Sequence, residues 1–114
     1  MNPLVRRRHA PLIQSPLKQA LVRQLGDISV ASELTRISVR EISTVHQITA
    51  AFVAATLREA QQIMASATRA GNMTPQKEAR LRAETEAYLT RMLGISNAGS
   101  QQMTQLLFAS SFRR

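Results

Sequence analysis

The chain has 114 residues and carries 15 Lys and Arg against 7 Asp and Glu, with 44% hydrophobic but only 4% aromatic residues. It contains no cysteine, which excludes disulfides, thiolate metal sites and thiol nucleophiles, and it has room for a single domain. The apolar positions are filled by Leu, Ile, Val, Met and many Ala, and this composition predicts an all-α fold.

The positive charge is concentrated at the two ends of the chain. No acidic residue precedes Asp27, whereas residues 27–112 carry 8 basic and 7 acidic side chains and are almost neutral. The sequence pI of about 11.7 therefore describes a basic leader and does not by itself indicate a nucleic-acid-binding body. The basic side chains of this leader are Arg6, Arg7, Arg8, Lys18 and Arg23.

Residues 1–14 contain two prolines and three consecutive arginines, and we expect them to form an extended or disordered basic arm. Ser15 and Pro16 are typical of a helix start, and Gly26 is typical of a helix end. The sequence therefore predicts a first short helix over about 16–25, at the start of a single helical domain that spans 15–114.

The stretch 28–70 contains no Gly and no Pro, and apolar residues recur every three to five positions along it. We expect one long amphipathic helix, capped by Asp27 or Ser29. The β-branched residues between Ile37 and Val53 lower helix propensity, so a break near 38–43 and a strand near 37–45 are the alternatives.

The clearest turn in the sequence is Gly71-Asn72-Met73-Thr74-Pro75. Gly71 suits a left-handed helix end, Thr74 an N-cap and Pro75 the first helical turn. This pattern predicts a second long helix over about 75–93, antiparallel to the first, and hence a helical hairpin. Residues 94–100 could be part of a longer helix, but their glycines favour a break before a last short helix over about 100–111.

The apolar stripes of these helices are expected to exceed what one hairpin can cover, so the uncovered part should contact another copy or another protein. The residues expected to form this packing interface are Leu34, Ile37, Ile42, Val45, Ile48, Phe52, Ile63, Leu81, Tyr88, Met92, Leu106 and Leu107.

The sequence lacks the patterns that usually carry catalysis. His46 has no second metal-ligating residue at helical spacing, and Glu78, Glu84 and Glu86 each have an arginine one turn away, as in surface ion pairs. No nucleophile elbow, phosphate-binding glycine loop or dinucleotide fingerprint is present. We therefore expect a non-enzymatic protein without catalytic residues, metal, cofactor or small-molecule substrate.

The sequence thus predicts a structural or assembly protein that forms a homo-oligomer or a subunit of a larger complex. Its basic arm would dock on an acidic partner, a nucleic acid or an anionic surface, with Leu4, Val5, Leu12 and Ile13 adding apolar contacts. No apolar stretch approaches the length that spans a bilayer. We expect an intracellular, cytoplasmic location, although the Arg-rich, acid-free leader also has the composition of an organelle transit peptide.

Two other functions stay open. The first is non-specific nucleic-acid binding through the arm. The second follows from the segment Phe52 to Ala60, the Thr74-Pro75 turn and the Ala-rich helix beyond it, which together resemble phasins, helical proteins that coat polyester granules in bacteria. This resemblance implies an amphipathic coat for a granule or membrane surface, and it transfers no site residue.

Overall fold

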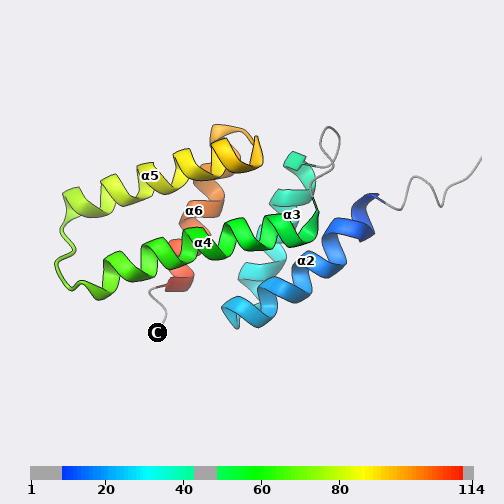
Figure 1. Ribbon diagram of the computed structural model, residues 1–114, viewed down its shortest axis with the longest axis horizontal. Helices are drawn as coiled ribbons and strands as arrows, with labels where there is room; N and C mark the ends of the chain where they lie inside the picture. Colours follow the sequence, from blue (N-terminus) through cyan, green and yellow to red (C-terminus); the bar gives the residue numbers. More distant parts are fainter. Residues whose placement is uncertain (1–8, 43–48, 112–114) are drawn as a thin grey trace, which may run out of the picture. The chain divides into compact units, whose positions relative to one another are not determined.

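The computed structural model describes residues 9–42 and 49–111, and this part of the chain contains five α-helices and no strand (Figure 1). The all-α prediction is therefore confirmed. The internal contacts of the chain divide it into two compact units, 1–55 and 56–114. The single domain expected over 15–114 stays a prediction. The helices are α2 (His9–Leu25), α3 (Ile28–Ile42), α4 (Ala50–Arg69), α5 (Pro75–Leu93) and α6 (Asn97–Ser111).

Helix α2 begins earlier than the sequence suggested. Residues 9–14, expected to be extended, form its first turns, and Pro16 lies inside the helix instead of at its start. Pro11 falls in the first turn, where backbone N–H groups have no intrahelical acceptor, so a proline is tolerated there. Pro16 removes one interior hydrogen bond from the helix. The extended conformation expected for residues 1–8 lies outside the described residues.

The connection between α2 and α3 follows the predicted signals. Gly26 has φ +71° and donates its N–H to the Val22 carbonyl at 2.8 Å. The Asp27 side chain then accepts a hydrogen bond from the Val30 N–H at 3.2 Å and caps α3. The two helices pack against each other within the first unit. Their fully buried large side chains include Leu17 and Leu21.

The stretch 28–70, expected to be one helix, contains two. Helix α3 ends at Ile42, Thr49 lies outside any helix, and α4 begins at Ala50; residues 43–48 lie outside the described part of the chain. The Thr49 hydroxyl accepts a hydrogen bond from the Phe52 N–H at 3.1 Å, which caps α4. The strand considered near 37–45 is wrong for residues 37–42, which are helical.

The predicted hairpin and its turn are confirmed. Helices α4 and α5 are joined by residues 70–74, and Figure 1 shows them as the green and yellow arms of the hairpin. Gly71 has φ +80°, which an L side chain rarely adopts. The Thr74 hydroxyl accepts a hydrogen bond from the Lys77 N–H at 3.2 Å, and Pro75 is the first residue of α5.

The break expected between 93 and 100 is confirmed and is short. Gly94 has φ +65° and closes α5 through its N–H to the Thr90 carbonyl. The Ser96 hydroxyl accepts from the Gly99 N–H at 3.0 Å, so α6 begins at Asn97, three residues before the expected start.

Helices α5 and α6 pack against each other in the second unit. The Thr90 and Ser100 hydroxyls are hydrogen-bonded at 2.6 Å near the connection. Further along, the Arg82 guanidinium lies 4.4 Å from the centre of the Phe108 ring. The buried apolar side chains of this unit are Leu57, Ala60, Met64, Leu81, Leu89, Leu93, Ile95, Met103, Leu107 and Phe108.

Candidate functional site

The residues predicted for the basic arm are only partly described. Arg6, Arg7 and Arg8 lie outside the described residues. Lys18 and Arg23 lie on α2, and both side chains are exposed to solvent. Two exposed cations are available on α2 for an anionic partner, and the role of the arm stays a prediction.

The predicted packing residues fall into four groups. Five are buried within the chain, namely Leu34, Ile37, Ile42, Leu81 and Leu107, whereas Tyr88 and Leu106 are half-buried. Val45 and Ile48 lie outside the described residues. The three that are exposed are Phe52, Ile63 and Met92, with 39%, 38% and 36% of their surfaces accessible.

Two of these exposed residues share one face of α4. Phe52 and Ile63 are three helical turns apart, which places them about 16 Å apart along the helix and nearly in line. The buried side of α4 lies beside this line and includes Val53, Leu57 and Met64. Helix α4 therefore carries a second row of apolar side chains that the chain itself does not fully cover.

An open groove lies at the tip of the hairpin, between the end of α4 and the start of α5. Its volume is about 300 Å³. Sequence reasoning did not identify it. Its lining residues are Ala67, Ala70, Asn72, Met73, Lys77, Arg80, Leu81 and Glu84.

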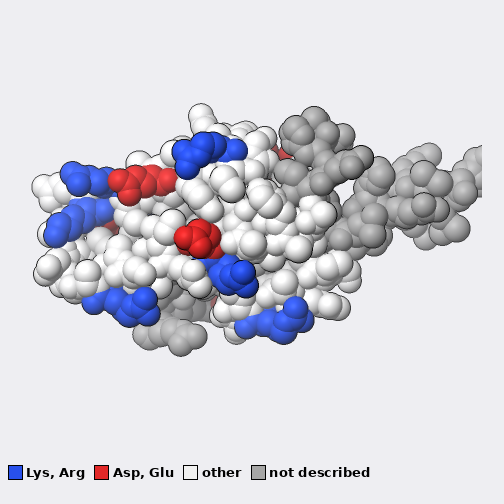
Figure 2. All heavy atoms as spheres, viewed as in Figure 1, with Lys and Arg blue, Asp and Glu red and all other residues white. Residues whose placement is uncertain are grey.

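Charges alternate along α5 beside this groove. Figure 2 shows basic and acidic side chains next to one another over α5. The Glu78 carboxylate accepts hydrogen bonds from the Arg82 guanidinium, with the Nη2 nitrogen at 3.2 Å. Lys77 and Arg80 are exposed at the groove, together with the acidic Glu84. The rim of the groove therefore carries two cations and one carboxylate.

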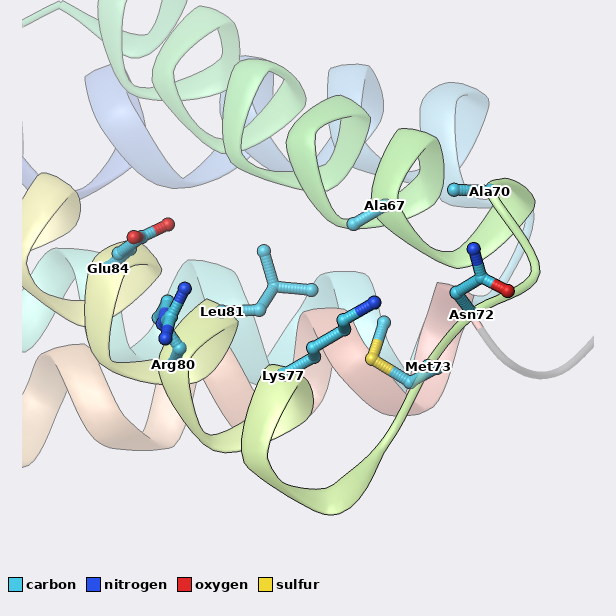
Figure 3. Close-up of a pocket in the computed structure, with 8 residues that line it drawn as sticks. All are labelled: Ala67, Ala70, Asn72, Met73, Lys77, Arg80, Leu81 and Glu84. Carbon is cyan, nitrogen blue, oxygen red and sulfur yellow. The ribbon is translucent and has the colours of Figure 1, made fainter.

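The groove has an apolar floor. Figure 3 shows the Leu81 side chain pointing from α5 toward α4, with Ala67 on that helix, Ala70 just after its end, and Lys77 extending beside Met73. Leu81 is buried, with 7% of its surface accessible. An apolar floor with a cationic rim can receive a large apolar side chain next to a negative charge.

The described residues contain no group of three or more His, Asp or Glu that could hold a metal ion. The prediction about His46 lies outside the described residues. Among described acidic groups, the pKa of Glu33 is lowered from its ordinary value by its hydrogen bond with the Arg36 guanidinium, one turn along α3. Both side chains are about half exposed to solvent, so this is a surface ion pair.

No helix in the described residues is long and apolar enough to cross a membrane. No known protein family, no curated protein and no solved structure matches the chain. No family match therefore supports the resemblance of Phe52–Ala60 and the following hairpin to phasins. The candidate surfaces are the outer face of α4 and the groove at the hairpin tip.

Proposed function

We propose that this protein is a non-enzymatic assembly protein that associates with further copies of itself through the outer face of α4. The observation that carries the proposal is the pair Phe52 and Ile63, which lie on one helix face with about 40% of each surface exposed. Single exposed apolar residues are ordinary in proteins, but two in line on an amphipathic helix form a strip that a second helix can cover.

The composition of α4 supports helix-to-helix contact. Ala55 is exposed three residues after Phe52, and such a small side chain permits close approach of a neighbouring helix. Glu59 lies between Phe52 and Ile63 on the same face, while Arg58 lies beside it. This face therefore combines two apolar residues with charges of both signs, which suits a helix that packs against a copy of itself.

The basic leader has a separate role in this proposal. Lys18 and Arg23 are exposed on α2, and Arg6, Arg7 and Arg8 precede it in the sequence. Such a cluster attracts acidic or phosphate-bearing partners over distances of about a Debye length, roughly 8 Å in physiological salt. We propose that it docks the assembled protein on an anionic partner.

Sedimentation equilibrium over a wide range of protein concentration tests the self-association. The double substitution Phe52→Ser and Ile63→Ser should weaken self-association at least tenfold. The two apolar side chains no longer contribute burial to the interface, which reduces the free energy of association by about 1.4 kcal/mol. The matched control is Ala51→Ser with Gln62→Ser, two exposed positions of α4 with the same spacing. This control should associate like the unmodified protein.

The proposal fails if the unmodified protein is monomeric at every concentration, or if both double variants associate equally well. Because all four positions are exposed, the helical content of both variants should equal that of the unmodified protein by circular dichroism.

A further inference from the structure

We infer that the groove between the end of α4 and the start of α5 is a docking site for an acidic peptide segment of a partner protein. The segment would insert one large apolar side chain next to its acidic residues. This site does not depend on the self-association proposed above, because neither Phe52 nor Ile63 lines it.

The floor of the groove is built for an apolar side chain. The wall opposite Leu81 consists of Ala67 on α4 and Ala70 just after it, whose short side chains leave space (Figure 3). Met73 lies at the mouth and is half-buried, and a methionine side chain adapts readily to the shape of a neighbour. The space therefore arises from small residues on one helix facing a large residue on the other.

The rim of the groove supplies the charge preference. Lys77 and Arg80 are both exposed on the first turns of α5. Arg69, at the last position of α4, is also exposed. The nearby Glu78 carboxylate is paired with Arg82, so it does not neutralise Lys77 or Arg80. The tip of the hairpin thus has an excess of positive charge around an apolar floor, which is complementary to an acidic, amphipathic segment.

Glu84 gives the site a direction. It lines the groove one turn beyond Arg80, toward the middle of α5. A carboxylate of the peptide is favoured beside Lys77 and Arg80 and disfavoured beside Glu84, since like charges repel. The acidic residues of the bound segment should therefore lie on the side of the hairpin turn.

The size of the groove favours a peptide over a lipid or a small molecule. Its volume of about 300 Å³ is at the lower end of the range for pockets that enclose small ligands, and this groove is open to solvent. The apolar floor consists of the Ala67, Ala70 and Leu81 side chains, with Met73 at the mouth, and gives no continuous channel for an acyl chain. One leucine or phenylalanine side chain, held by its own backbone, fits the space.

Selection from a random peptide library displayed on phage, with the immobilised full-length protein as target, tests the inference. The enriched peptides should share a large apolar residue with Asp or Glu on one side of it. Their affinity for the protein in solution is then measured by fluorescence anisotropy with dye-labelled synthetic copies.

Four variants locate the binding. Lys77→Glu with Arg80→Glu should lower the affinity about tenfold or more, because two rim charges are reversed. Ala67→Leu, which fills the floor without changing charge, should lower it by a similar factor. Glu84→Gln should raise it by about twofold to threefold. The matched control, Arg58→Glu with Arg91→Glu, changes the net charge equally at exposed positions outside the groove and should have no effect.

Several results would overturn the inference: no enriched peptide, enriched peptides without acidic residues, or equal losses in the groove and control variants. If no peptide binds, but anionic lipid vesicles bind the protein and this binding is lost in Ala67→Leu, the groove is a lipid site instead. Circular dichroism of each variant separates loss of binding from loss of structure.

Discussion

At the scale of single residues, hydroxyl groups show how the helices tolerate buried polar atoms. Thr35, Ser38 and Thr85 are buried, and each donates its hydroxyl to the carbonyl four residues earlier. Such a bond satisfies a hydroxyl that has left water, and this avoids a cost of about 1–3 kcal/mol. Thr and Ser can therefore occupy core positions of these helices without polar neighbours.

Thr104 is the exception among the described residues. It is fully buried on α6, and its hydroxyl oxygen has no hydrogen-bond partner within the described part of the chain. We expect Thr104→Val to raise the free energy of unfolding by about 1 kcal/mol, because valine has the same shape and no polar group to desolvate. Urea unfolding, with the midpoint shifting and the slope unchanged, measures the effect.

The matched control for this prediction is Thr85→Val. Thr85 is buried on α5, and its hydroxyl donates to the Leu81 carbonyl at 2.8 Å. Because Thr85→Val removes a satisfied hydrogen bond, it should raise the free energy of unfolding by less than Thr104→Val does, or should lower it. If Thr104→Val destabilises as much as Thr85→Val, the Thr104 hydroxyl has a partner and the prediction is wrong.

At the scale of helices, the boundaries depend on a few capping residues. Thr74 is the clearest, because its hydroxyl accepts the Lys77 N–H and Pro75 follows it. Thr74→Ala should destabilise the second unit by about 1 kcal/mol, since one backbone donor of α5 loses its partner. Amide exchange of Lys77 should speed up about fivefold in this variant.

Thr74→Ser is the control, because serine keeps the accepting hydroxyl and is at least as good an N-cap. Its exchange rate at Lys77 should equal that of the unmodified protein. Equal acceleration in both variants would show that the methyl group of Thr74, and not its hydroxyl, stabilises the start of α5.

The same capping chemistry explains which helices the sequence predicted. Gly71, Thr74 and Gly94 have local signatures, and the helix over 75–93 follows from them directly. The boundary before α4 has a weaker signature, because Thr49 caps it within a stretch that lacks Gly and Pro. The absence of helix breakers was therefore a poor indication of one continuous helix. Pro16 predicted a helix start but lies inside α2, since a helix can contain proline at the cost of one hydrogen bond.

The candidate site was less predictable than the helices. The exposure of Phe52 and Ile63 depends on which side of α4 is covered, and their neighbours Val53 and Leu57 are equally apolar in the sequence but buried. The groove requires Ala67 to face Leu81 across the hairpin, which helical periodicity alone does not determine. Its only sequence signal is the basic residues on both sides of the Gly71–Pro75 turn.

At the scale of the whole molecule, the distribution of charge separates two kinds of binding. The segment 27–112 is almost neutral, whereas every charged side chain in the first 26 residues is positive. Contacts made by α4 and by the hairpin tip would combine apolar burial with a few charges and should depend weakly on salt. Contacts made by the leader with a polyanion would release counterions and should depend strongly on salt.

This contrast gives a test of the leader. Deleting residues 1–8 removes Arg6, Arg7 and Arg8 and leaves α2 intact from its first residue. If the leader contacts phosphates, the slope of log affinity for double-stranded DNA against log salt should become shallower by about 0.9 for each lost contact. The helical circular dichroism signal should stay the same, because every described helix is retained.

Deleting residues 113–114 is the comparison, since it removes two arginines from the other end. Equal changes in the two truncations would indicate an effect of net charge alone, and an unchanged slope in both would exclude the leader as a polyanion-binding arm.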